Sequence, residues 1–288
     1  MIESPLVPFA EDLVVDLSAT GLTDGNGLRE AVGKLLLELL GLKVVVARIS
    51  RISGAMTNVI FRVDCVEGPS YLLRVYGQGL DWMFSRQRER LWSKILAGCG
   101  ICPRWVAMFG NGRLEEWVDG ITLTAPMMRE EQMFEQIAKI MRRMHVDGSL
   151  AIRTLLAEDP VNNLWSRLDR WQARAVEVWD RVVELHQGRQ AELKSAKSFL
   201  SMPPWINRLR KDLETDQDIV VSHCDLQNGN IMLRNDPSHV ILVDFEYACW
   251  APAAFDIANH FCEWGADYCH PEHPHLVDYA KGPTMDQM

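Results

Sequence analysis

The stretch SHCDLQNGNIML, residues 222–233, followed by VILVDFEYA, residues 240–248, decides the fold of this chain. Apolar runs at 219–221 and 240–243 flank a polar segment. Such runs predict short buried strands, and the polar segment between them is expected to form a loop on a rigid support. Side chains on that loop would therefore be held in place for chemistry.

Three polar residues on and after this loop have the spacing that phosphoryl transfer requires. Asp225 can accept a hydroxyl proton, and Asn230, five residues later, can coordinate a hard cation through its amide oxygen. Asp244 follows nineteen residues after Asp225 (244 minus 225), where the chain is expected to return beside the loop. An Asp beside Asn and Gly is ordinarily only a turn. The complete pattern is far more specific, so we interpret Asp225 as the base and the other two as magnesium ligands.

Composition narrows the class of protein. The chain has 288 residues, 48% of them hydrophobic, which suffices for one sizeable core or two linked lobes. Its 30 basic and 39 acidic residues give a net charge of −9, which argues against nucleic acid as a partner. No long apolar run and no basic leader appear, so we expect no membrane span and a cytoplasmic location. Seven cysteines without a regular framework fit reduced thiols.

Two short patterns suggest other kinds of site. Cys99 and Cys102 form a C-x-x-C pattern, which is typical of redox or zinc chemistry but here lacks a second pair at metal spacing. His270, His273 and His275 lie in a His/Pro segment, for which a solvated loop is the simpler interpretation.

Periodicity predicts the order of secondary structure. After an irregular lead-in at 1–27, leucines at helical spacing predict a helix over 28–40 that ends at Gly41. Thr124 is a candidate cap for further helices, and an apolar stripe at 164–185 predicts a core helix rather than a ligand cage. Between these helical regions the pattern predicts three strands, a helix and two strands, at 44–50, 58–65, 71–76, 81–96, 105–109 and 113–118.

The motifs SHCDLQNGNIML, VDFEYA and FDIANHFCEW resemble those of the choline/ethanolamine kinase family, and the similarity extends from about Val44 over the rest of the chain. HFCEW and the residues after it are more similar to choline kinases, notably those of plants. The resemblance implies an α+β, bilobal protein-kinase-like fold. An N-terminal lobe at 1–118, an antiparallel sheet with the 28–40 helix, would bind the nucleotide. A mainly helical C-terminal lobe at 119–288 would carry the catalytic and substrate residues.

The resemblance also implies which residues bind ATP. Arg74 stands where protein kinases carry a strand lysine, and Glu89 on the next helix would pair with it to hold the phosphates. Glu116 and Val118 belong to a hinge whose backbone would contact adenine, although an edge strand is the alternative. A turn of small residues would cover the phosphates, although most such turns are only turns. The residues of that turn are Ser53, Gly54, Ala55, Met56, Thr57 and Asn58.

Two further groups of residues belong to the catalytic loop and its support. Gln227 and Glu246 are candidates for ordering the loop or a metal-bound water. Asp256 resembles the buried aspartate that ties the catalytic loop to a helix in kinase-like folds, and a plain helix N-cap is the alternative.

The acceptor implied by the resemblance is choline, whose quaternary ammonium donates no conventional hydrogen bond. Its site must therefore use aromatic faces and carboxylates. Glu263 and Tyr268 match family positions that line the amine pocket, whereas Trp264 is expected to pack in the core. Ala266 stands where some relatives carry tyrosine.

The leading interpretation is an ATP- and magnesium-dependent choline kinase that makes phosphocholine for phosphatidylcholine synthesis. Ethanolamine kinase is the nearest alternative. Relatives continue with helices that carry further aromatic residues beyond the position of Met288, so a shortened C-terminal lobe with an incomplete amine pocket is expected. A homodimer stays open, as does a catalytically weak, nucleotide-binding partner subunit of a full-length kinase.

Overall fold

Contacts within the chain divide it into two compact units, each containing two separate stretches of sequence. Unit 1 comprises Met1–Arg143 and Asn228–Glu246, and unit 2 comprises Met144–Gln227 and Tyr247–Met288. The predicted lobe boundary at 118/119 stays a prediction. The computed structural model describes residues 7–17, 26–52, 58–77, 85–156, 163–201, 203–214, 219–235, 239–268, 270, 272 and 276–287.

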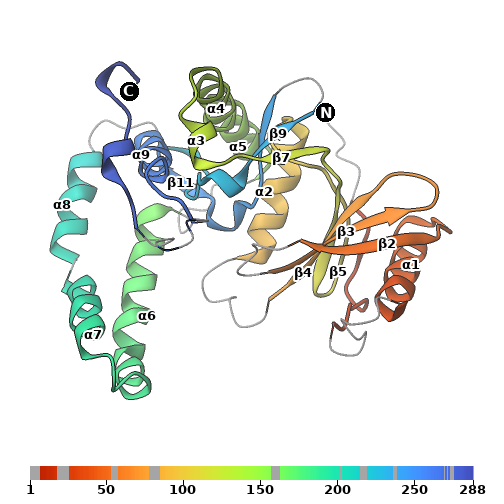
Figure 1. The fold of residues 1–288 in the computed structure, drawn as a ribbon, viewed down its shortest axis with the longest axis horizontal. Helices are drawn as coiled ribbons and strands as arrows, with labels where there is room; N and C mark the ends of the chain where they lie inside the picture. The colour runs from red at the N-terminus through yellow and green to blue at the C-terminus, as the bar shows by residue number, and fades with distance from the viewer. Residues whose placement is uncertain are drawn as a thin grey trace. The chain divides into compact units, whose positions relative to one another are not determined.

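Unit 1 is built on a six-stranded sheet with the order β1-β5-β6-β4-β3-β2. Figure 1 labels its strands β2, β3, β4 and β5. Neighbouring strands are antiparallel except for β1 and β5, which pair in parallel. The two-residue strand β1 was missed because it is too short to show a period. The strands are β1 (Phe9–Ala10), β2 (Val46–Ile52), β3 (Asn58–Cys65), β4 (Tyr71–Tyr76), β5 (Trp105–Phe109) and β6 (Gly112–Glu116).

Helix α1 (Asn26–Leu40) lies beside this sheet (Figure 1). It packs on the sheet through the leucine stripe that the sequence shows. Val32 and Leu36 have no exposed surface and join Val63, Leu73 and other strand residues in one core. Gly41 has a φ of +65° and its N–H donates to the carbonyl of Leu37 at 2.9 Å, so the helix ends in the left-handed conformation that glycine adopts without strain.

Helix α2 (Arg86–Gly98) follows β4, so the predicted order of three strands, helix and two strands is confirmed. Ser85 caps this helix by accepting a hydrogen bond from the N–H of Arg88 at 3.3 Å. Trp92 and Leu96 bury one face, and Glu89 is buried beside them.

A second sheet of unit 1 has the order β10-β9-β7, with β7 (Gly120–Thr122), β9 (Ile231–Arg234) and β10 (Val240–Leu242) all antiparallel. Thr124 caps α3 (Ala125–Met128), as predicted, by accepting from the N–H of Met127. Helix α4 (Glu131–Arg143) then contacts β10 through an apolar face. The sheet explains why residues 228–246 belong to unit 1, because β9 pairs with a strand more than a hundred residues earlier.

Unit 2 is mainly helical around the two-stranded pair β8 (Ile219–Ser222) and β11 (Cys249–Pro252). Single π and 3-10 turns, η1 to η6, separate several elements. The helices and turns of the unit are η1 (Met144–Gly148), α5 (Ser149–Leu155), α6 (Leu164–Leu185), α7 (Gln190–Lys197), η2 (Ser198–Ser201), α8 (Pro203–Glu214), α9 (Ala253–Glu263), η5 (Tyr279–Lys281) and η6 (Met285–Gln287). Turn η3 (Asn228–Asn230) directly precedes β9, and turn η4 (Phe245–Tyr247) follows β10.

Helix α6 has the predicted bounds but is not the core helix that its stripe suggested. Leu164 and Arg167 are its buried residues, and Trp171 is half-buried against the edge of the Tyr247 ring at 5.9 Å. The helix contacts β11 and η2, and a salt bridge of 2.7 Å joins Asp169 to Arg210 of α8. An amphipathic period thus identified the helix, but the depth of burial depends on how many elements cover the stripe.

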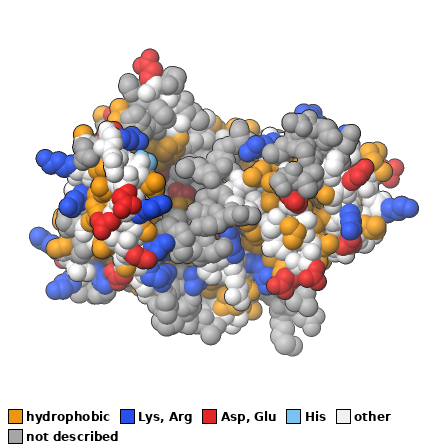
Figure 2. Space-filling model, turned by 90° about the horizontal axis from the view of Figure 1, so that it is seen from below, with side chains coloured by type: hydrophobic (Ala, Val, Ile, Leu, Met, Phe, Trp, Pro, Cys, Tyr) orange, Lys and Arg blue, Asp and Glu red, His pale blue; other side chains and the backbone are white. Residues whose placement is uncertain are grey.

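Charged side chains on the surface are mixed in sign, as Figure 2 shows for one face of the molecule. Surface pairs such as Arg189–Glu192, at 3.2 Å, are exposed and contribute little to stability. Among the described residues, no helix combines the length and the apolar character needed to cross a bilayer.

Candidate active site

Asn230 and Asp244 lie at the same end of the β9–β10 hairpin. Ile231 is opposite Leu242 in the antiparallel register, and the N–H of Val243 donates to the carbonyl of Asn230 at 3.0 Å. Asp244 follows directly with a φ of +68°, a conformation that is uncommon outside glycine and that recurs at functional sites. Asp244 therefore follows a residue that is hydrogen-bonded to Asn230, whereas its return beside Asp225 stays a prediction.

Their side-chain oxygens suit a magnesium ion. A carboxylate and an amide are hard oxygen donors, and magnesium ordinarily takes one or two protein ligands together with phosphates and water. Within the described ranges there is no group of three or more His, Cys, Asp or Glu residues that would enclose a metal alone. Oδ1 of Asp244 already faces a cation, because Nη1 of Arg74 lies 3.4 Å away.

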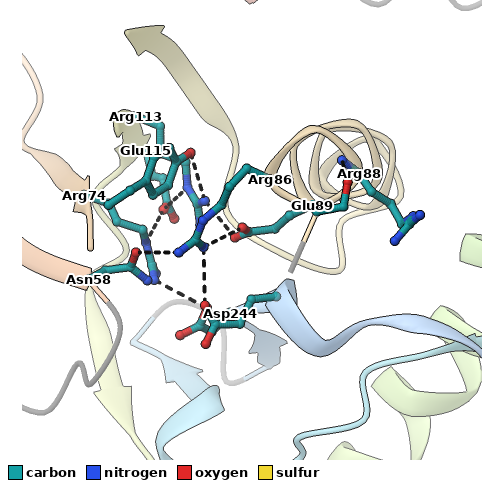
Figure 3. Close-up of polar contacts among 11 residues, drawn as sticks. Asn58, Arg74, Arg86, Arg88, Glu89, Arg113, Glu115 and Asp244 are labelled. Atoms are coloured by element: carbon teal, nitrogen blue, oxygen red, sulfur yellow. Dashed lines mark hydrogen bonds and ion pairs between the residues drawn. The ribbon is translucent and has the colours of Figure 1, made fainter. Parts of the chain in front are cut away.

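Arg74, on β4, is buried within a network of charged residues (Figure 3). Its Nε donates to Oε1 of Glu115 at 3.1 Å, in addition to the contact with Asp244. Glu89 instead accepts from Arg113 at 2.7 Å and from Arg86 at 3.2 Å. The predicted direct pair of Arg74 with Glu89 is therefore not formed, because Arg113 from the neighbouring strand occupies that carboxylate.

Arg86 connects the first turn of α2 to the segment that follows β10. Its guanidinium contacts Oδ1 of Asn58 at 3.5 Å (Figure 3). It also contacts Oε2 of Glu246 at 3.4 Å and lies 4.8 Å from the centre of the Tyr76 ring. Glu246, a predicted site residue, is thus buried against a cation. Arg86 was not predicted, because it lies in the first turn of α2, outside the strands and motifs whose pattern indicates a site.

Asp225 lies in a loop of unit 2 whose backbone is held by Asp256 of α9. Asp256 has no exposed surface, and its carboxylate accepts from the N–H of His223 at 2.9 Å and of Cys224 at 2.8 Å. Nε2 of His145, in the π turn η1, lies 2.9 Å from the same carboxylate. Cys224, directly before Asp225, has a φ of +64°, so these bonds hold a residue in a strained conformation.

The N-cap alternative for Asp256 is wrong, because the cap of α9 is Pro252 and Asp256 lies within the first turn. Its interpretation as the support of the catalytic loop agrees with its hydrogen bonds to the loop backbone.

Asn259 and His260 of α9 hold the other side of the loop, and the sequence analysis missed both. Oδ1 of Asn259 accepts from the N–H of Leu226 at 2.7 Å, and Nδ1 of His260 lies 3.0 Å from the Leu226 carbonyl. Trp264 donates from Nε1 to Nε2 of His260 at 3.2 Å and is 1% exposed, so it packs in the core as expected. The positions 256, 259 and 260 share one helix face, a signal that was present in the sequence.

These contacts make His260 neutral, with its proton on Nδ1, and burial lowers the pKa of its imidazole below the usual value. An unfolded histidine titrates near pH 6.5. Between the lowered folded pKa and that value, the unfolded state binds more protons, so the free energy of unfolding falls as the pH falls through this window.

We therefore expect urea denaturation of the wild type to show full stability above about pH 6.5 and a loss below it. The variant His260→Gln should lose less stability over the same range, although it is less stable at pH 8. Equal pH dependence of the two proteins would contradict the assigned protonation state.

Glu263, at the end of α9, and Tyr268 form a hydrogen-bonded pair beside Asp225. The Tyr268 hydroxyl donates to Oε2 of Glu263 at 2.8 Å. Burial raises the pKa of the Glu263 carboxyl and the Asp225 charge adds to that rise, whereas the bond from Tyr268 lowers it. Burial and Glu263 raise the pKa of Tyr268, so the phenol stays protonated. The carboxylates of Glu263 and Asp225 repel each other, and the ring of Tyr268 lies beside them. Such a group favours the binding of a cation.

Comparison with known proteins connects this geometry to a family. The sequence model of choline/ethanolamine kinases matches residues 49–288. This chain belongs to the choline/ethanolamine kinase family. The match includes the β9–β10 hairpin, Arg74 and helix α9.

Individual members of the family are similar over most of the chain. Probable choline kinase 2 of Arabidopsis thaliana is 36% identical over 244 residues, which are 82% of this chain and 64% of that protein. The human choline/ethanolamine kinase is 30% identical over 83% of this chain and 60% of its own length. The chain thus spans less than two thirds of the length of these curated relatives.

A solved structure of the family confirms the predicted fold class. The ethanolamine kinase of Plasmodium vivax superimposes with a TM-score of 0.68 at 22% identity, covering 93% of this chain and 73% of its own. The α+β, kinase-like fold with an antiparallel N-terminal sheet and a helical remainder is therefore that of the choline/ethanolamine kinases.

The remaining predicted site residues of this family member are placed as follows. Val118 is buried, Glu116 pairs with the exposed Arg104 at 2.9 Å, and Gln227 is half-buried. Asn58 contacts Arg86, whereas Ser53, Gly54, Ala55, Met56 and Thr57 lie outside the described residues. Whether these residues bind a nucleotide stays a prediction.

The two alternative sites receive no support from the described residues. Sγ of Cys102 is buried and donates to the carbonyl of Ser93 at 3.3 Å, and burial raises the pKa of this thiol well above its usual value. Such a thiol is a poor nucleophile and a poor metal ligand. His273 and His275 lie outside the described residues.

Proposed function

We propose that this chain is an ATP- and magnesium-dependent choline kinase, which transfers the γ-phosphate of ATP to the choline hydroxyl. The observation that carries the proposal is the pair of oxygen ligands, Asn230 and Asp244, held at one end of a hairpin with Arg74 directed at Asp244. Membership of the family supports the reaction class, and plant choline kinases are among the relatives.

In this proposal each residue has one role. Asp225 orients the choline hydroxyl and accepts its proton, and the bonds from α9 to residues 223, 224 and 226 keep its carboxylate in place. Asn230 and Asp244 would hold the magnesium ion, which neutralises phosphate charge when it is bound. Arg74 would supply a positive charge to the phosphates.

The proposed binding site of the amine is the cluster of Asp225, Glu263 and Tyr268. A quaternary ammonium is a permanent cation without a conventional hydrogen-bond donor, so it gains from carboxylate charge and from an aromatic face. Burial and the neighbouring Asp225 disfavour the ionised form of Glu263, and a bound cation would remove that penalty. Ethanolamine carries N–H groups that can donate hydrogen bonds to the same carboxylate, so it is the competing substrate.

A coupled assay of ADP release tests this function, with choline, ethanolamine or no acceptor in the presence of magnesium. We expect acceptor-dependent ADP release with choline and a lower kcat/KM with ethanolamine. Preference for ethanolamine would reassign the substrate. ADP release that does not depend on either amino alcohol, or none at all, would overturn the proposed function and leave the partner-subunit interpretation.

The substitution Glu263→Gln tests the amine site. Loss of the carboxylate charge should raise the KM for choline by about tenfold, because a charge contact near a protein surface is worth on the order of 1.4 kcal/mol or more. The KM for ATP should change by less than about twofold. Glu177→Gln on the exposed face of α6, where the carboxylate pairs with Arg174 at 2.6 Å, is the matched control. An unchanged KM for choline would remove Glu263 from the site.

A further inference from the structure

Arg113 is a fully buried arginine that the kinase signature does not include. It lies on β6 with 2% of its surface exposed, and its guanidinium stacks on Trp105 at 4.0 Å. Its Nη1 donates to Oε1 of Glu89 at 2.7 Å, and its Nε donates to Oε1 of Glu115 at 2.7 Å. One guanidinium thus connects helix α2 to the strand β6 through two short, charge-assisted hydrogen bonds.

Glu115 is shared by two arginines. The same Oε1 atom that accepts from Arg113 also accepts from Nε of Arg74 at 3.1 Å (Figure 3). Arg74 and Arg113 are directly opposite each other on the antiparallel strands β4 and β6, a like-charge pair that is unfavourable by itself. Glu115, two residues after Arg113 and on the same face of β6, lies diagonal to Arg74 and compensates both charges.

Glu115 stays ionised in this position. Burial favours its protonated form, but the charges of Arg113 and Arg74 outweigh burial and lower the pKa of its carboxyl below the usual value. Glu115 is 5% exposed, so its carboxylate interacts with the two guanidinium groups and hardly with solvent.

The contact with Glu115 determines where the rest of Arg74 points. A guanidinium is a planar fork, so fixing its Nε fixes the direction of its two outer nitrogens. With Nε held by Glu115, Nη1 lies 3.4 Å from Oδ1 of Asp244. Arg74 is therefore divided between a permanent partner, Glu115, and Asp244, which is a metal ligand in the proposed function.

We propose that Arg113 and Glu115 are positioning residues for nucleotide binding: Arg113 fixes Glu115, and Glu115 fixes Arg74 so that its outer nitrogens face the metal ligand and the phosphates. The inference rests on the proposed function and deepens it. In this arrangement the strand-to-helix ion pair of kinases is extended to the chain Glu89, Arg113, Glu115, Arg74 and Asp244. Without the Glu115 charge, Arg74 would pair more closely with Asp244 and compete with magnesium.

The substitution Glu115→Gln tests this role with little change in shape. Calorimetric titration of ADP at fixed magnesium should show an affinity about tenfold weaker than in the wild type, since one charged contact to Arg74 is lost. Raising the magnesium concentration should restore part of the affinity, because magnesium then competes better for Asp244. A residue with a merely structural role would not change the magnesium dependence.

Asp64→Asn is the matched control for this substitution. It also removes a carboxylate charge from the sheet of unit 1, where Asp64 pairs with Arg62 at 2.7 Å, but it lies outside the network. Its affinity for ADP and its magnesium dependence should equal those of the wild type.

Arg113→Lys tests the geometry separately from the charge. Lysine keeps the positive charge but cannot donate in a rigid fork to two carboxylates, so it should weaken ADP binding about as much as Arg113→Met does. Circular dichroism checks that each variant is folded. The proposal is overturned if folded Glu115→Gln or Arg113→Lys binds ADP with wild-type affinity and magnesium dependence. It is also overturned if Asp64→Asn produces the same loss.

Failure of the proposed function gives a different result. ADP binding requires no acceptor, so a wild type that binds ADP with magnesium but releases none with choline or ethanolamine would overturn the proposed reaction alone. A wild type without measurable ADP affinity would overturn both.

Discussion

The substitution Asp225→Asn is expected to lower kcat for choline by at least about 10²-fold, the lower range for loss of a general base. Asparagine has the same shape as aspartate but cannot accept the hydroxyl proton at neutral pH. The backbone around it should not move, because Asp256, Asn259 and His260 hold the neighbouring residues through main-chain atoms. Initial rates measured at saturating ATP and choline give kcat directly.

Three other measurements define this variant. Affinity for ADP with magnesium should match that of the wild type, because Arg74, Asn230 and Asp244 are unchanged. The pKa of Glu263 should fall, since the Asp225 charge is one of the causes that raise it. Thermal stability should change by less than a few degrees. A kcat near that of the wild type in folded protein would mean that Asp225 is not the base.

The substitution Asp256→Ala should lower the free energy of unfolding by about 3–5 kcal/mol, the range for removing one partner of a buried charged network. The main-chain N–H groups of the buried His223 and the half-buried Cys224 lose their acceptor, as does Nε2 of His145. Leaving a buried donor unsatisfied is costly because it has given up its hydrogen bonds to water. Urea denaturation at pH 8 measures the change.

The same substitution should also reduce kcat by at least about 10²-fold in the fraction that folds. Without the hydrogen bonds to Asp256, nothing offsets the strain of the positive φ at Cys224, so the loop that positions Asp225 should change conformation. Asp169→Ala on α6 is the matched control. Its carboxylate is exposed and pairs with Arg210, so its loss should cost less than about 1 kcal/mol. A similar, small cost for both variants would show that Asp256 is not the support of the loop.

Much of the fold could be predicted because its elements carry a clear period. Strands β3, β4 and β5 have the predicted bounds, and so does helix α6, since alternation and helical spacing are local properties of the sequence. Strand β9 was not predicted, although it is central to the site. It follows the catalytic motif directly, and its four residues are too few to show a period beside the more obvious loop signal.

The candidate site could be predicted in part for the same reason. Asp225, Asn230 and Asp244 occur in a motif whose spacing indicates phosphoryl transfer. Asn259 and His260 were within reach of sequence analysis, because they share a helix face with Asp256 at spacings of three and four residues. They were not predicted, because their partners are backbone atoms of Leu226, and a hydrogen bond to backbone does not depend on the residue type in the loop.

The sequence by itself determined the kinase-like order of elements and the family, and it singled out Asn230, Asp244 and Asp225 as the candidate oxygen ligands and base. Only the tertiary structure decided which cation meets which carboxylate. The sequence pattern suggested a simple strand-to-helix pair of Arg74 and Glu89. In the structure, the β4–β6 register places Arg113 opposite Arg74, and Glu115 forms ion pairs with both arginines. The physical reason is that ion pairs depend on distances across a sheet, and residues some forty positions apart in sequence become neighbours only when the strands pair.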